Sequence, residues 1–155
     1  MTDTLQLLRD AWNRMRSLPG GKQAFSKLVG TMAPYTGTVS PEVLELERGF
    51  SRVQMKDRRR VRNHLKSVHA VALMNLAEAA SGLAFVYGLP PKTRAILTGL
   101  SIDYLKKARG TLIAECKCEP PTTNDRQECE IEVVTRDASG EIVTRARAKW
   151  LVGPL

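Results

Sequence analysis

The sequence VHAVALMNLAEAASGLAFV at residues 68–86 decides how this chain folds. It places apolar residues on nearly every side of a helix, and a helix of that kind has to be buried. After His69 its polar residues are only Asn75, Glu78 and Ser81, and the three-residue step from Asn75 to Glu78 puts these two on one stripe. We therefore predict a central buried helix with a narrow polar stripe.

Glu78 is the residue of this helix that needs an explanation. An ionised carboxylate in apolar surroundings is costly, so it needs a cationic partner, a water molecule or a proton. Burial of this kind is also how proteins tune an acid or base for catalysis. Two interpretations stay open at this point: a catalytic carboxylate, or a structural carboxylate paired with an arginine at an interface.

The start of the helix is suited to binding negative charge. Ser67 directly precedes the apolar run and is a suitable N-cap. The first amides, at residues 68–71, would then lack acceptors and would lie at the positive end of the helix dipole. Such amides can hold a carbonyl oxygen as it becomes an oxyanion, with Glu78 about two turns further along. This geometry favours acyl chemistry.

The spacing of Asn63, His69 and Glu78, followed by Ala-Ala-Ser-Gly at 79–82, resembles the central helix of hotdog-fold acyl-CoA thioesterases of the phenylacetate-degradation type. The resemblance extends to Met-Ala-Pro-Tyr-Thr-Gly-Thr at 32–38, Arg-Arg-Val-Arg-Asn-His at 59–64 and Asp-Tyr-Leu-Lys-Lys-Ala-Arg-Gly at 103–110. The nearest branch is one known mainly as a domain of unknown function. The resemblance implies an α+β hotdog fold, in which an antiparallel sheet wraps around a long central helix.

Carried over position by position, the resemblance implies roles for individual residues. Glu78 stands where the family has its catalytic Asp or Glu, Asn63 where it has an active-site Asn, and His69 where it has the His of a His-Gly-Gly turn. The chain departs at the next two positions, Ala70 and Val71, where the family has glycines whose amides receive the thioester carbonyl. Ala70 and Val71 each still have a backbone amide, but we expect their side chains to crowd that carbonyl.

The resemblance also implies partners. Hotdog enzymes are dimers or dimers of dimers, so Glu78 of one chain would face Asn63 of another. Coenzyme A would be part of the substrate, with no separate cofactor, and Val71 would line the acyl site together with Ser81, which also suits plain packing. The candidate ligands of the coenzyme A phosphates are the run from Arg58 to Arg62, within it Arg59 and Arg62 in particular, together with Lys106, Lys107 and Arg109.

The rest of the chain supplies a sheet and an extension. Apolar residues at helical spacing predict two helices within residues 1–34, ended by Pro19-Gly20-Gly21 and by Pro34. Alternating patterns predict two strands between 36 and 57, then four at 93–105, 110–118, 126–136 and 141–152. We predict one domain over 1–155, with a helical extension at 1–34 and a core at 36–155. The pattern alone supports an α+β fold, and the hotdog assignment depends on the resemblance.

Composition narrows the possible partners. The net charge is +8, with a basic run between Lys56 and Lys66, which favours an anionic partner. No aromatic residue lies in that run and we find no nucleic-acid motif, so we expect a phosphate-bearing small molecule such as coenzyme A and no nucleic acid. The three cysteines and two histidines lack metal-ligand spacing, so we expect reduced thiols and no metal. Without a long apolar run or a signal peptide, we expect no membrane insertion and a cytoplasmic location.

Three functions stay open. The leading one is hydrolysis of an acyl thioester, with Glu78 as general base or nucleophile and the amides near Ala70 as the oxyanion site. The second is a non-catalytic hotdog protein that binds an acyl group or acyl-CoA, because the paired glycines are missing. The third is a hotdog acyl dehydratase or hydratase that uses His64 and Glu78, which are 14 residues apart.

Overall fold

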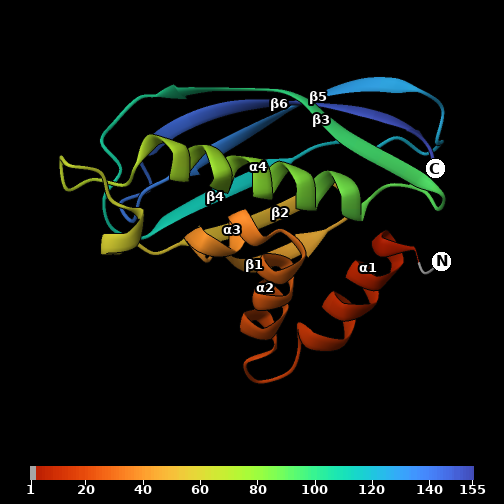
Figure 1. Cartoon of the computed structure of the whole chain (residues 1–155), viewed down its shortest axis with the longest axis horizontal. Helices are drawn as coiled ribbons and strands as arrows, with labels where there is room; N and C mark the ends of the chain where they lie inside the picture. Colours follow the sequence, from red (N-terminus) through yellow and green to blue (C-terminus); the bar gives the residue numbers. More distant parts are fainter. Residues whose placement is uncertain (1–2) are drawn as a thin grey trace.

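The computed structural model describes residues 3–155 as four α-helices, a short 3-10 helix and six strands (Figure 1). In chain order these are α1 (Thr4–Met15), α2 (Gly21–Met32), α3 (Pro34–Val39), β1 (Glu42–Glu47), β2 (Phe50–Met55), η1 (Arg59–Val61), α4 (Ala70–Tyr87), β3 (Thr93–Tyr104), β4 (Leu112–Lys117), β5 (Gln127–Arg136) and β6 (Ile142–Pro154). The two long predicted helices of the extension, the central helix and the six predicted strands all form, with bounds close to those expected.

The six strands form an antiparallel sheet in the order β1-β2-β4-β5-β6-β3, and α4 lies across its inner face (Figure 1). Small residues on α4 let the sheet approach closely. The Ser51 hydroxyl on β2 donates to the Ala80 carbonyl (2.7 Å), and a Cβ added at Gly82 would lie 3.3 Å from the Trp150 ring. This arrangement confirms the α+β hotdog fold.

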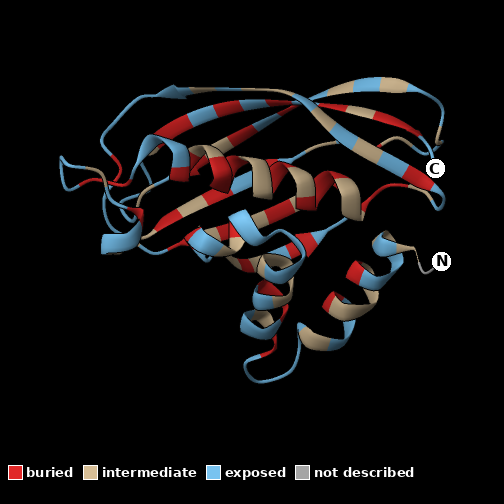
Figure 2. Ribbon diagram, in the orientation of Figure 1, coloured by how far each residue is buried: buried red, intermediate tan, exposed pale blue. Residues whose placement is uncertain are grey.

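Helix α4 is buried where it faces the sheet and only half-buried on its opposite side (Figure 2). Its buried residues include Leu73, Leu76 and Phe85, whereas Val71 on the other side is 47% exposed. Among residues 3–155, α4 is the one helix long and apolar enough to cross a bilayer, but 56% of that window is buried inside the protein. It is therefore the core helix of this fold, with one side only partly covered by the described chain.

Helices α1 and α2 pack against each other and against the core (Figure 1). The Trp12 and Phe25 rings meet edge to face with centroids 5.0 Å apart. Arg9 ties α1 to the end of α4, since its Nε donates to the Tyr87 carbonyl (2.8 Å) and its Nη2 to the Leu89 carbonyl. The predicted amino-terminal helical extension is thus present and joined to the central helix.

Ser26 joins α2 to β1, which lies at one edge of the sheet. Its Oγ accepts a hydrogen bond from the Val43 amide (2.8 Å) and donates one to the Lys22 carbonyl (2.7 Å). Ser26 and Val43 are both buried. The hydroxyl therefore satisfies an edge-strand amide that would otherwise be buried without an acceptor.

Residues 36–39 differ from the sequence prediction. The alternating pattern was expected to begin at Thr36, but residues 34–39 form the short helix α3. The prediction was wrong because Pro34 was interpreted only as the end of α2, whereas a proline in the first turn also starts a helix, where its missing N–H needs no acceptor.

Candidate active site

Helix α4 begins at Ala70, and its N-cap is His69, where Ser67 was predicted. The Nδ1 of His69 accepts a hydrogen bond from the Val71 amide (3.0 Å). An imidazole that accepts at Nδ1 carries its proton on Nε2, so the ring keeps an N–H donor. The prediction for Ser67 was wrong because its hydroxyl donates instead to the Oδ1 of Asn63 (3.1 Å), inside the loop that precedes the helix.

Asn63 shapes that loop. Its Oδ1 also accepts from the Leu65 amide (2.9 Å) and the Ser67 amide (3.2 Å), so three donors converge on one oxygen. Its side-chain Nδ2 has no acceptor among residues 3–155. The amide nitrogen is therefore the part of Asn63 that can still contact a substrate or a second chain.

The amides at the start of α4 are only partly free. Those of Val68 and His69 each donate to a backbone carbonyl at 2.8 Å, and that of Val71 donates to the His69 ring. In the described part of the chain, the amides of Ala70 and Ala72 have no acceptor. The helix start thus keeps two donors for an anion, and one of them, Ala72, was not among the residues predicted from the sequence.

The start of α4 forms one wall of a cleft of about 610 Å³. The other walls come from α3 and η1, and the lining residues are Tyr35, Thr38, Val39, Arg60, Val61, Arg62, His69, Val71 and Ala72. The hydroxyl of Tyr104, at the end of β3, donates to the Ala70 carbonyl (2.9 Å) and fixes the helix start against the sheet. Apolar walls with a few convergent polar groups are typical of a small-molecule site.

Glu78 lies on the half-buried side of α4, about 12 Å along the helix axis from Ala70. Desolvation by burial raises the pKa of its carboxyl group above the usual value of 4.5. Among residues 3–155 no side chain forms an ion pair or hydrogen bond with this carboxylate. A structural Arg–Glu pair within the chain is therefore not observed, and the group has the raised proton affinity expected of a catalytic base.

Ser81 supports the turn that carries Glu78. Its hydroxyl donates to the Glu78 backbone carbonyl (2.9 Å) and accepts from the Trp150 indole N–H (3.3 Å), and the residue is fully buried. The hydroxyl is enclosed between α4 and β6, which fits the packing role of Ser81 and not contact with a substrate.

The basic residues predicted to bind phosphate fall into two groups. Arg62 is paired with Asp57 (2.6 Å), and Lys106 is paired with both Asp137 (2.8 Å) and Glu141 (2.5 Å). Their charges are largely balanced by these carboxylates.

The other three, Arg59, Lys107 and Arg109, are exposed and form no ion pair in the described chain. Arg60, which belongs to the basic run at 58–62 that the sequence offered as a phosphate site, lines the cleft. The basic run at 58–62 was the available signal, but its pattern does not tell which arginine faces a cleft.

Within residues 3–155, no group of three or more His, Cys, Asp or Glu side chains is placed to bind a metal ion. Cys116, Cys118 and Cys129 are free thiols.

Comparison with known proteins gives the family. The profile of a family described as a domain of unknown function (DUF4442) matches residues 21–152. No match is found among curated proteins. One similar solved structure, the structural-genomics target APC5556, is 29% identical, with a TM-score of 0.83 over 96% of this chain and 99% of that one.

Two others carry a named activity. A protein of unknown function from Pseudomonas aeruginosa, described as a probable thioesterase, is 20% identical with a TM-score of 0.77 over 89% of this chain and 97% of its own. A thioesterase from Haemophilus influenzae is 15% identical with a TM-score of 0.70 over 100% of this chain and 94% of its own. The chain has the hotdog fold of these thioesterases and belongs to the DUF4442 family.

Proposed function

We propose that this protein hydrolyses an acyl thioester of coenzyme A. The observation that carries the proposal is Glu78, a half-buried carboxylate on the central helix of a hotdog fold, with a raised pKa and no side-chain partner among residues 3–155. The named activity of structures with the same fold supports it. The free amides and the His69 ring at the start of α4 supply the second requirement, which is a place for an oxyanion.

In this proposal ionised Glu78 accepts a proton from a water molecule as the water oxygen attacks the carbonyl carbon. The carbonyl oxygen becomes an oxyanion that the amides of Ala70 and Ala72 and the Nε2–H of His69 stabilise. The intermediate then collapses, the carbon–sulfur bond breaks, and Glu78 returns the proton to the leaving thiolate. Direct attack by the Glu78 carboxylate, which would form an anhydride that water then hydrolyses, uses the same groups.

The distance between these groups requires a second chain. A reacting carbonyl has to lie about 3 Å from both its attacking atom and its oxyanion donors, yet Glu78 and Ala70 of one chain are about 12 Å apart along α4. We therefore propose a homodimer, or a dimer of dimers, in which Glu78 of one chain faces the helix start and Asn63 of another. In support, β3 pairs with β6 alone within residues 3–155, so its other edge is open, and its residue Ile96 is 52% exposed.

A non-catalytic acyl-CoA-binding protein is the second candidate. It is favoured by the engagement of the Val71 amide with His69, which removes one donor from the oxyanion site. A dehydratase has less support, because His64 lies exposed in the loop before α4 and forms no hydrogen bond with Glu78 in the described chain.

The test is thiol release from short, medium, long and aromatic acyl-CoA esters, with Glu78→Gln beside the parent and exposed Glu130→Gln as the matched control. Glutamine keeps the shape of the side chain and removes the base, so we expect a loss of about 10²–10⁴-fold in kcat for Glu78→Gln and none for the control. A folded Glu78→Gln protein as fast as the parent would refute the role of Glu78. Saturable binding without turnover in the parent would establish the binding protein instead.

A further inference from the structure

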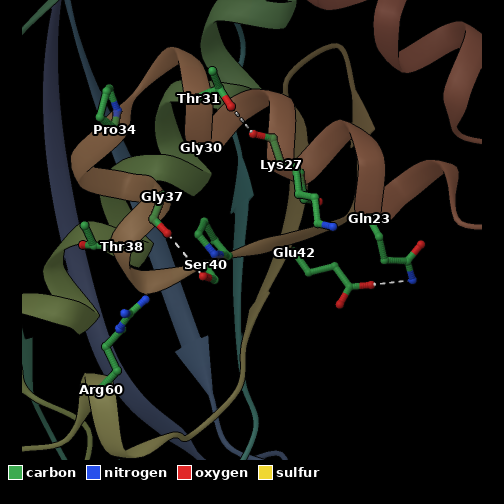
Figure 3. A pocket seen from close by; sticks show the side chains of 12 residues that line it. Gln23, Lys27, Gly30, Thr31, Pro34, Gly37, Thr38, Ser40, Glu42 and Arg60 are labelled. Carbon is green, nitrogen blue, oxygen red and sulfur yellow. Dashed lines mark hydrogen bonds between the residues drawn. The ribbon is translucent and has the colours of Figure 1, made fainter.

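A second, larger groove lies beside the cleft, between α2, α3 and η1 (Figure 3). Its volume is about 830 Å³, within the range of about 300–1,000 Å³ that is common for sites of small molecules and cofactors. The residues that line it are Gln23, Ser26, Lys27, Gly30, Thr31, Pro34, Gly37, Thr38, Ser40, Pro41, Glu42 and Arg60. The reaction proposed above uses none of these residues, and two of them, Thr38 and Arg60, also line the cleft.

Close packing of backbone holds the groove open. Gly30 of α2 and Gly37 of α3 touch, and a Cβ added at Gly37 would lie 2.7 Å from the Gly30 carbonyl oxygen. On the other side, Nη2 of Arg58 donates to the Val39 carbonyl (2.8 Å) and holds η1 against the end of α3. The walls are therefore fixed by the fold, so the groove exists without a ligand.

Two cations face the groove from opposite sides, Lys27 from α2 and Arg60 from η1 (Figure 3). Neither forms an ion pair in the described chain, whereas Arg62 and Lys106 do. The one carboxylate in the lining, Glu42, already accepts a hydrogen bond from the Gln23 side chain (3.2 Å). An unpaired guanidinium and an unpaired ammonium at one groove are suited to phosphate oxygens.

The groove continues into the cleft at the helix start, because Thr38 and Arg60 line both. A ligand that fills the two hollows therefore carries phosphate at one end and reaches the α4 amides with the other. Acyl-CoA has this form: a pantetheine arm joins the thioester to a pyrophosphate and a phosphorylated adenosine. The arm of an acyl carrier protein ends at a single phosphate and would leave the groove empty.

We infer that the groove of Lys27 and Arg60 binds the nucleotide phosphates of coenzyme A, so that the acyl carrier is free coenzyme A and not a carrier protein. This inference rests on the proposed acyl thioester substrate. It also moves the phosphate site away from Arg62 and Lys106, the two predicted ligands that carboxylates already neutralise.

The binding test uses isothermal titration with coenzyme A, adenosine 3′,5′-bisphosphate, 4′-phosphopantetheine and pantetheine. The variant is Lys27→Ala/Arg60→Ala, and the control Lys22→Ala/Arg16→Ala removes the same charge from α2 and from the C-cap of α1, outside both hollows. We expect coenzyme A and the bisphosphate to bind at least about tenfold more weakly to the groove variant and unchanged to the control, with pantetheine unchanged in both. Equal binding by parent and groove variant, or an equal loss in the control, would overturn the inference.

Hydrolysis of an acyl-N-acetylcysteamine thioester, which lacks the nucleotide, separates the two proposals. If Glu78 supports its hydrolysis while the groove variant binds coenzyme A like the parent, only the groove assignment fails. If the binding of coenzyme A depends on Lys27 and Arg60, but neither acyl-CoA nor the acyl-N-acetylcysteamine thioester is hydrolysed, only the proposed reaction fails. If 4′-phosphopantetheine binds the parent as tightly as coenzyme A does, the nucleotide contributes nothing and the inference is refuted.

Discussion

Replacing Ser26 by alanine tests how the amino-terminal extension stabilises the sheet. The hydroxyl accepts from the Val43 amide at 2.8 Å, and Val43 is only 1% exposed. Alanine removes this acceptor and leaves a buried N–H unpaired, which costs about 1–3 kcal/mol. The second bond of the hydroxyl, to the Lys22 carbonyl, adds little because that carbonyl lies within the hydrogen-bonded helix α2.

Thr31→Ala is the matched control, because Thr31 makes the same kind of bond on α2, to the Lys27 carbonyl (2.9 Å), but is exposed and has no contact with a strand amide. For a chain of 155 residues, about 1–3 kcal/mol corresponds to a fall in Tm of about 2–12 °C for Ser26→Ala. Urea unfolding followed by circular dichroism should show a lower midpoint with an unchanged slope. If Ser26→Ala and Thr31→Ala have free energies of unfolding within about 0.5 kcal/mol of each other, the reasoning is refuted.

Two further predictions concern the candidate site. Burial raises the pKa of Glu78 in the folded state above 4.5, so the folded protein binds a proton at Glu78 more tightly than the unfolded chain does. The stability that results is present below pH 4.5 and is lost as the pH rises through the folded-state pKa. Glu78→Gln should therefore have a higher Tm than the parent at pH 7 and no advantage at pH 4, and a lower Tm at pH 7 would contradict this. At His69, asparagine can still accept from the Val71 amide but has no ring donor, so His69→Asn should keep the stability that His69→Ala loses, about 1 kcal/mol, while both lose kcat equally. If His69→Asn has the kcat of the parent, His69 acts only as the N-cap of α4 and not as an oxyanion donor.

Much of the fold could be predicted because its patterns are local. The apolar run at 68–86 and the alternation in β5, where buried Ile131 and Val133 follow exposed glutamates, define their elements without help from the rest of the chain. Helix α3 has no such periodicity in its six residues: its one local signal is Pro34 at its start, and the contact of Gly37 with Gly30 that holds it on α2 cannot be seen in the sequence.

The site was less accessible to sequence reasoning. Glu78 stood out because a lone carboxylate in an apolar helix has few explanations. The residue that caps α4 depends on the loop around Asn63. The Ser67 hydroxyl donates to the Oδ1 of Asn63 in this loop, and His69 accepts from the Val71 amide as the N-cap instead. Similarly, Arg60 is the arginine of the basic run that lines both hollows, and this position depends on the packing of η1 on α3.

The contact between Ser26 and Val43 has a consequence for assembly. A sheet with two open edges can add a copy at each edge and grow into a ribbon, whereas a sheet with one open edge stops growing when two copies have joined. Helix α2 packs on β1 at one end of the sheet, while β3 at the other end pairs with no strand but β6 in the part of the chain that the structure describes. In the homodimer proposed above, the extension would leave only the β3 edge for joining a second copy, and the Ser26 hydroxyl, which holds α2 to β1, would help to prevent growth into a ribbon.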